Sequence, residues 1–406
     1  MNIRFQTSIT TILSLLLAGT LFAQTRPAAG RPQGSINLSL WKGISTQRAD
    51  TTSRTCLNIG VLSTMNRLDG LGMNLIGAVT RARVNGVQLS GLANVNGGSL
   101  RGLQAAGITN INGHDLAGLS LAGLISINGN KAQGIIASGL ANITGDESRG
   151  VLLGGLLTVA GENAAGFHFA GLANLAGKDF CGISTSGLLS IAGNDLRGMQ
   201  LTGLGSITGS DLTGVQLSGL GNVTGGTLTG MQIGAVNLAG RAKGVQIGLF
   251  NYYKEDFKGI QLGLVNTNPQ TRIQLMLFGG NATKLNIGAR FKNRLFYTIV
   301  GGGTHYLDFG DRFSAALFYR AGLALPEWKR WTLSGDLGYQ HIETFKNKDY
   351  GLPARLYALQ ARINLEYRMG KRISLFVSGG YGGSRYYTRN ATFDKGVLAE
   401  GGIILF

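Results

Sequence analysis

Proline and cysteine are scarce in this sequence, and each scarcity narrows the class of protein. The 406 residues include 5 prolines and 66 glycines without a Gly-X-Y period, which excludes a collagen triple helix. Hydrophobic residues make up 44%, so the glycine belongs to folded units and not to a disordered chain. Two cysteines, Cys56 and Cys181, are too few for a disulfide framework. Their pairing would require the chain to fold back, so we expect two free, buried thiols.

Residue patterns of catalysis and metal binding are also missing. No Gly-x-Ser-x-Gly segment marks a strand-to-helix elbow, and the glycine-rich stretches lack the lysine of a phosphate-binding loop. The four histidines show no metal-ligand spacing: His114, His168, His305 and His341. We therefore predict no catalytic residue, no metal site and no cofactor, and a non-enzymatic protein.

No apolar run of about eighteen residues follows residue 23, so we predict no transmembrane helix. Residues 1–23 have the pattern of a secretory signal, with a positive Arg4, an apolar stretch from Ile12 to Leu17 and a cleavage segment ending at Ala23. We therefore expect export. Residues 24–55, rich in Arg, Thr and Ser, are predicted to form a linker and N-terminal cap.

Acidic residues are few, 20 against 37 Lys and Arg, and the net charge is +17. Residues 270–406 hold 19 basic and 9 acidic residues, and 19 − 9 gives +10, so most of the excess belongs to the C-terminal part. Such a charge attracts nucleic acids. The predicted export argues against a nucleic-acid partner.

What the chain does contain is a repeat of sixteen residues, present nine times between Gly86 and Thr229. Glycine returns at three positions of every copy, represented in the first copy by Gly86, Gly91 and Gly97. A strict period of this kind is typical of a repeat array, in which each unit buries its apolar face against its neighbours. Such an array offers a surface or scaffold and seldom a unique catalytic pocket.

Within one copy, Val87 and Leu89 alternate with polar residues, which is the period of a β-strand. We expect Leu92, Val95 and then Leu100 to turn inward. One polar column is predicted to become a hydrogen-bonded ladder along the array: Asn94, Asn110, Asn142, Asn174 and Asn222, with Ser or Thr in the other copies. An aspartate column at the following turn is explained better by turn capping than by calcium: Asp115, Asp179, Asp195 and Asp211.

The same alternation also fits membrane strands of a large barrel, and this alternative stays open. Two observations favour a β-solenoid. The connections between strands are all equal, whereas barrel strands alternate short and long ones. Aromatic girdles are absent, because residues 86–229 contain only Phe167, Phe169 and Phe180.

After Gly230 the repeat changes to segments such as Gly244-Val-Gln-Ile-Gly248-Leu-Phe-Asn251. This G-φ-Q-[IL]-G-L-x-N pattern resembles the glycine-rich surface-repeat family of bacterial exported proteins, over roughly residues 70–268. The resemblance implies a location in the cell envelope and no known reaction or ligand. We assign the solenoid to residues 56–268.

Residues 269–406 are predicted to form a barrel of about eight antiparallel strands, similar to small outer-membrane barrels, with a soluble β-sandwich or lipocalin-like barrel as the alternative. Eight alternating stretches can be drawn, and long connections at 303–311, 343–353 and 383–394 alternate with short ones. Aromatic residues bracket the apolar faces and are expected to form girdles: Trp331, Tyr339, Tyr357 and Tyr367. The chain ends in Phe406, which resembles the assembly signal of such barrels. Glu400 lies on the same side of its strand as Ile404 and Phe406. A carboxylate facing lipid would be costly, so either the strand has a bulge near Glu400 or this side of the strand faces the barrel interior.

Charged residues are expected in the barrel interior: Arg320, Asp336, Arg362, Glu366 and Arg368. An eight-stranded barrel is narrow enough for its own side chains to fill it, so we predict a salt-bridged plug, with a pore as the alternative.

The sequence thus predicts an exported, all-β envelope protein, in which a barrel in the outer membrane anchors a structural or recognition surface. The expected partners are outer-membrane lipid and the barrel-assembly machinery, with glycan, peptidoglycan or a host surface ligand left open. A transport role, with the repeats as plug or as extra membrane strands, is the alternative. If the C-terminus is periplasmic, eight strands bring the start of the barrel, and hence the array, to the periplasmic side. The family resemblance instead suggests the cell surface. An additional strand from residues 244–268 would reconcile these two placements.

Overall fold

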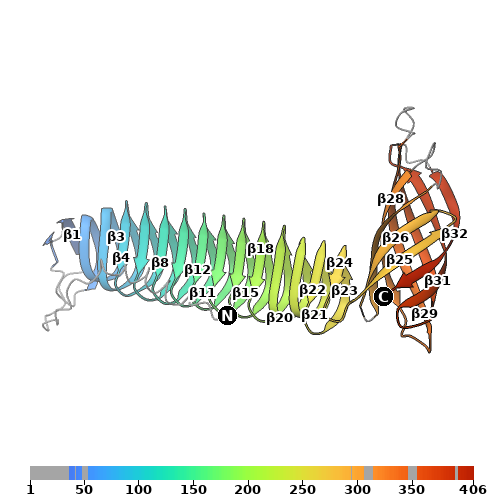
Figure 1. The fold of residues 1–406 in the computed structure, drawn as a ribbon. Helices are drawn as coiled ribbons and strands as arrows, with labels where there is room; N and C mark the ends of the chain where they lie inside the picture. The colour runs from blue at the N-terminus through green and yellow to red at the C-terminus, as the bar shows by residue number, and fades with distance from the viewer. Residues whose placement is uncertain are drawn as a thin grey trace. The chain divides into compact units, whose positions relative to one another are not determined.

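The structure is a computed structural model that describes residues 36–41, 43–47, 54–293, 295–305, 314–345, 354–388 and 392–406. The described chain is all-β, with a parallel β-solenoid of about 12 turns followed by a closed barrel of eight antiparallel strands (Figure 1). The predicted fold class is confirmed. The expected secretory signal lies outside the described residues, as does most of the expected linker. No helix among the described residues has the length and apolar character needed to cross a membrane.

The chain divides into two compact units, residues 1–219 and 220–406. The second unit contains the last coils of the solenoid together with the barrel, so its boundary differs from the one drawn at residue 268. The parallel stack also begins before residue 56, because β1 pairs in parallel with β3 through Ile36 and Leu57.

Each coil of the first unit contains a longer strand and a strand of four residues, both in parallel register with the next coil. Gly102 lies opposite Gly118 and Asn94 opposite Asn110, so the register follows the sixteen-residue period. The strands of the first unit are β1 (Ile36–Trp41), β2 (Ile44–Ser45), β3 (Arg54–Ser90), β4 (Ala93–Asn96), β5 (Ser99–Ala106), β6 (Thr109–Asn112), β7 (Leu116–Ala122), β8 (Ile125–Asn128), β9 (Ala132–Ser138), β10 (Ala141–Thr144), β11 (Ser148–Gly154), β12 (Leu157–Ala160), β13 (Ala164–Ala170), β14 (Ala173–Ala176), β15 (Phe180–Ser186), β16 (Leu189–Ala192), β17 (Leu196–Thr202), β18 (Gly205–Thr208) and β19 (Leu212–Ser218).

We number the positions of a coil from 1 to 16, beginning at Gly86. The glycine at position 1 has a positive φ in every repeat, for example 121° at Gly150. A Cβ atom there would lie 2.1 Å from the carbonyl oxygen of Gly134 in the preceding coil. Both the backbone conformation and the close approach of neighbouring coils therefore require glycine.

The side chains that point into the coil are not all those that the sequence analysis expected. Leu92 and Val95, expected inside, lie at the surface, and Leu92 is 46% exposed. Gln88 and Asn94 are fully buried instead. In a parallel, in-register stack each buried amide lies one strand separation, roughly 4.8 Å, from its equivalent in the next coil. Ladders between equivalent amides therefore pair part of the polar interior, and the apolar side chains of the corner remain outside.

The apolar part of the interior comes from positions 3 and 15, whose sizes compensate. Position 15 is large where position 3 is polar or small, as in the pair Leu116 and Ser120. Position 15 is small where position 3 is bulky, as in Ser148 and Leu152. The central side chains share one buried cluster, including Leu100, Leu116, Ala132, Ile136 and Leu152. Close packing explains the compensation, because each of these coils buries one large apolar side chain at the two positions.

The second unit begins with further coils, in which the offset between paired residues falls to fifteen or fourteen. Its solenoid strands are β20 (Gly221–Ile233), β21 (Val236–Ile247), β22 (Phe250–Tyr253), β23 (Phe257–Leu262) and β24 (Val265–Thr267). Its barrel strands are β25 (Arg272–Gly280), β26 (Leu285–Lys292), β27 (Phe296–Thr304), β28 (Ser314–Ala324), β29 (Trp331–Thr344), β30 (Arg355–Arg368), β31 (Ile373–Tyr386) and β32 (Thr392–Leu405).

The barrel closes by antiparallel pairing of β25 with β32, for example Met276 with Ile404. Residues 244–268 pair in parallel as coils and do not supply an additional barrel strand. The repeats likewise form coils, so both alternatives that made them membrane strands are wrong. Two of the connections expected to be long, 303–311 and 343–353, lie largely outside the described residues. The third, 383–394, is wrong, because β31 extends to Tyr386 and β32 begins at Thr392.

Along the barrel strands apolar side chains alternate outward with polar ones inward. In β30, Leu359 and Ile363 are exposed, whereas Arg362 is buried. In β32, Glu400 and Ile404 are both buried in the barrel. The facing of this strand is therefore reversed from the expectation, which resolves the conflict of a carboxylate on the outer wall.

Candidate functional sites in the barrel and the solenoid

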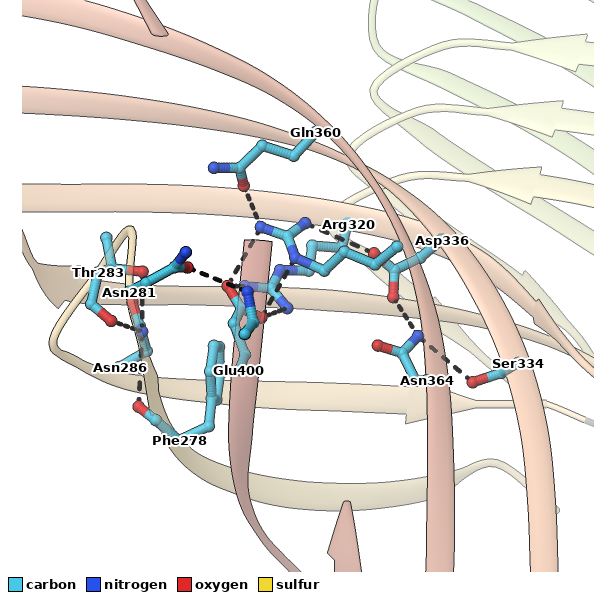
Figure 2. Close-up of polar contacts among 12 residues, drawn as sticks. Phe278, Asn281, Thr283, Asn286, Arg320, Ser334, Asp336, Gln360, Asn364 and Glu400 are labelled. Atoms are coloured by element: carbon cyan, nitrogen blue, oxygen red, sulfur yellow. Dashed lines mark hydrogen bonds and ion pairs between the residues drawn. The ribbon is translucent and has the colours of Figure 1, made fainter. Parts of the chain in front are cut away.

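The barrel interior contains a cluster of buried ions centred on Glu400 (Figure 2). Arg320 donates two hydrogen bonds to its carboxylate, of 2.8 and 3.1 Å. Arg362 lies 3.2 Å from the same carboxylate and 3.7 Å from Asp336, and it also contacts Gln360. Asn364 donates a 2.7 Å hydrogen bond to Asp336. Two cations and two anions therefore neutralise one another within the barrel.

A second pair lies closer to the short turns. Arg290 donates to Glu366 over 2.9 Å and to Gln274 over 2.7 Å, with both ionic side chains buried. Arg368, expected in the interior, is 42% exposed and pairs instead with Glu327. It is excluded from the interior because it lies at the end of β30, where the strand leaves the barrel.

The space between the two ion clusters is small. The cavity bordered by Arg290, Arg320, Asp336 and Glu366 has a volume of about 10 Å³, room for about one water molecule. Phe278 and Phe318 pack under the Arg320 guanidinium at 4.7 and 5.0 Å from their ring centres. These contacts agree with the salt-bridged plug that the sequence predicts.

The four predicted girdle residues form two groups on β29 and β30. Trp331 pairs with Tyr367, with ring centres 4.7 Å apart, next to the short turn. Tyr339 and Tyr357 both contact Tyr387 near the opposite end. Trp331 and Tyr339 are eight residues apart, which at about 3.3 Å per residue and a tilt near 40° spans roughly 20 Å.

Phe406, the predicted assembly residue, follows the end of β32. Its backbone N–H donates to the carbonyl of Arg372 over 2.9 Å, and its side chain is 39% exposed. The last residue is therefore held at the short-turn side of the barrel with its ring accessible.

In the solenoid interior, Asn94 donates to Asn110 over 3.0 Å, and a second ladder links Asn96 to Asn112. Ladders of equal amides continue where the neighbouring coil also has an amide, as from Asn222 to Asn237 at 2.8 Å. Where the neighbour has a hydroxyl, the amide donates to a backbone carbonyl. Asn142 donates to the Ile136 carbonyl of its own coil, and Asn174 donates to the Thr185 carbonyl of the next coil.

One edge of the solenoid carries the charged residues. We define this polar edge as positions 12 to 16, Gly97–Arg101 in the first repeat. Asp179 accepts a hydrogen bond from the backbone N–H of Asp195, one coil on, which agrees with turn capping. Lys131 lies 3.3 Å from Glu147 in the next coil, and this contact lowers the pKa of that carboxyl group.

Both cysteines are free and exposed, so the expectation of buried thiols is wrong. Cys181 occupies position 16, directly after the buried Phe180, where alternation turns the side chain outward.

His168 is the one ionisable side chain at position 3 of the nine repeats. It is 3% exposed and lies against Phe180, with ring centres 5.2 Å apart. Burial lowers the pKa of His168 to about 4, so the imidazole is neutral at pH 7.

The surface that sequence reasoning missed is the corner opposite the polar edge. We define this Gly-Leu corner as positions 6 and 7, Gly91–Leu92 in the first repeat. Position 7 carries an exposed apolar residue in every repeat: Leu92, Ile108, Leu124, Leu140, Leu156, Leu172, Leu188, Leu204 and Leu220. Beside the corner runs a groove of about 1010 Å³, lined by Leu89, Leu121, Leu153 and Phe169 among others. The regular recurrence of leucine after glycine was the available signal.

The last coil of the solenoid packs on the outer wall of the barrel within the second unit. Asn266 donates to the Thr298 hydroxyl in β27 over 2.9 Å. Gln261 accepts a hydrogen bond of 3.1 Å from Asn293 in the turn that precedes β27. Thr298 is fully buried, although it lies on the outward side of its strand.

Within the described residues, no group of three or more His, Cys, Asp and Glu side chains is placed to hold a metal ion. No protein-family model, curated protein or solved structure matches this chain. The resemblance to the surface-repeat family therefore stays a prediction.

Proposed function

We propose that this protein is an exported, non-enzymatic component of a bacterial cell envelope. Its barrel is embedded in the outer membrane, and its solenoid is a structural or recognition surface on the periplasmic side. The observation that carries the proposal is the polarity of the barrel. Its outer wall is apolar between two aromatic groups, whereas its interior holds buried ion pairs, which is the arrangement of outer-membrane barrels.

The periplasmic placement follows from the short turns. In outer-membrane barrels the short turns face the periplasm, and the last coil contacts Asn293 in one of these turns. The expected partners are membrane lipid, the barrel-assembly machinery acting on Phe406, and peptidoglycan or another envelope glycan along the polar edge. The packed interior gives the transport alternative no support.

Epitope tags in Gram-negative cells test this placement. One tag is inserted after Gly129 in the solenoid, and a second between residues 346 and 353, the connection on the opposite side of the barrel. We expect the second tag to be labelled on intact cells and the first only after the outer membrane is opened. A protein that stays out of the outer-membrane fraction and shows no heat-modifiable migration would contradict the membrane assignment. Labelling of the first tag on intact cells would contradict the periplasmic one.

A further inference from the structure

We infer that the Gly-Leu corner in the last coils of the solenoid, at Leu249 and Leu264 in the second unit, inserts into the acyl-chain region of the membrane leaflet on the short-turn side of the barrel. This inference rests on the proposed membrane location of the barrel. The occupant of this apolar corner is therefore lipid hydrocarbon, and the last coils are a second membrane-contacting element of the chain.

The first observation is the distribution of charge around the coil. None of the nine repeats has Asp, Glu, Lys or Arg at positions 1 to 11, and all such residues lie at positions 12 to 16. The coil is thus neutral and apolar around the corner and charged at the polar edge. An element with one apolar and one charged side is suited to a membrane interface.

The second observation is the backbone. In the first unit, the corner residues from Leu92 to Leu204 donate the N–H to the carbonyl of their equivalents in the preceding coil, as Leu140 does to Leu124 over 2.8 Å. In the second unit Leu249 donates to the Ala235 carbonyl over 2.9 Å, and its own carbonyl accepts from Val265 over 3.0 Å. A backbone group that is paired between coils can face hydrocarbon without being left unsatisfied. The corner at Leu249 therefore meets the main requirement for contact with lipid.

The third observation is the orientation of the last coil on the barrel. Asn266 donates to the Gly263 carbonyl within the coil and to Thr298 on the barrel wall, and Gln261 accepts from Asn293 in the short turn. The Gly263 backbone, at the corner itself, lies beside the Tyr319 hydroxyl of β28. Tyr319 pairs with Val300 and is therefore farther from the turn than Thr298, so the corner is directed along the outer wall away from the turn. Leu249 and Leu264 are exposed in these coils, and the charged residues between 244 and 268 all lie at 254–258.

Site-specific fluorescence tests the inference on the full chain. In a background with Cys56→Ser and Cys181→Ser, single cysteines are introduced by Leu249→Cys and Leu264→Cys at the corner. Asn194→Cys at the polar edge and Leu337→Cys on the barrel wall are the matched controls. Each is labelled with an environment-sensitive nitrobenzoxadiazole probe. The protein is then folded into vesicles of phosphatidylethanolamine and phosphatidylglycerol, with or without brominated acyl chains.

We expect blue-shifted emission, strongly quenched by brominated lipid, at both corner positions and at residue 337, but not at residue 194. Quenching at 337 with both corner probes in water would overturn the inference and leave the proposed function intact. Loss of quenching at 337 itself would instead overturn the proposed function. A blue shift at the corner that brominated lipid does not quench would indicate a second copy covering it, which also contradicts lipid insertion. Unchanged circular dichroism of each variant controls for folding.

Discussion

Arg320 and Glu400 form a doubly hydrogen-bonded ion pair inside the barrel, at 2.8 and 3.1 Å, with side chains 3% and 1% exposed. The same carboxylate also lies 3.2 Å from Arg362. One anion therefore stabilises two buried cations. Because a buried charge without its partner is costly, Glu400 sets the electrostatic balance of the interior.

Replacement of this carboxylate should destabilise the barrel strongly. Glu400→Gln keeps the shape but removes the charge, so we expect the free energy of unfolding to fall by about 3–5 kcal/mol. Urea unfolding from vesicles, followed by tryptophan fluorescence, measures the change. The control is Glu343→Gln, whose partner Arg355 is 64% exposed, with an expected loss of about 0–1 kcal/mol. Equal losses in the two variants would refute this role of Glu400.

Acid should destabilise the solenoid through His168. Its pKa is about 4 in the folded chain against an ordinary value of 6.5. Between these values the unfolded chain takes up a proton that the folded chain does not, so stability falls as pH drops from 6.5 to 4, by up to about 3 kcal/mol. His168→Gln, which introduces the residue found at Gln104 and Gln200, should remove this part of the pH dependence. Thermal midpoints of both proteins at pH 7 and pH 4 provide the comparison. The same loss in both would exclude His168 as its source.

The position-1 glycines should tolerate no side chain. Gly150→Ala combines a φ of 121° with a Cβ only 2.1 Å from the Gly134 carbonyl oxygen. We expect a loss of at least about 1–3 kcal/mol. Gly221→Ala is the control, because the nearest atom to its Cβ is 3.8 Å away and alanine occupies that position in other repeats. Thermal unfolding followed by circular dichroism should separate the two, and similar midpoints would count against the steric account.

The size compensation between positions 3 and 15 predicts non-additive variants. Leu152→Ser leaves a cavity beside Ser148 and should cost about 2–5 kcal/mol. Ser148→Leu alone overfills the coil and should cost about 1–3 kcal/mol. The double variant reproduces the pair Leu116 and Ser120, so its loss of stability should be smaller than the sum of the two single losses. Additive losses in this double-mutant cycle would show that the two positions do not share one space.

Much of the architecture was predictable because it repeats. The glycine period indicated coils, and alternation with aromatic ends indicated the eight barrel strands. The outward facing of the apolar residues of β30 also followed from its pattern. The facing of β32 did not, because Glu400 and Ile404 lie on one side and the alternation alone cannot say whether that side is inside. The corner leucines were likewise assigned to the wrong side. Leucine is usually buried, so the sequence favoured the core, whereas these side chains are exposed.

By itself the sequence determined the period, the approximate extents of the barrel strands and the segregation of charge to positions 12–16, because these depend on local spacing along the chain. Only the tertiary structure decided that Gln88 and Asn94 face inward and Leu92 outward. A buried amide is tolerable only when it has a hydrogen-bond partner, and for Asn94 that partner, Asn110, comes from the next turn of the solenoid. The same holds for Arg320, whose place inside the barrel depends on a carboxylate eighty residues away.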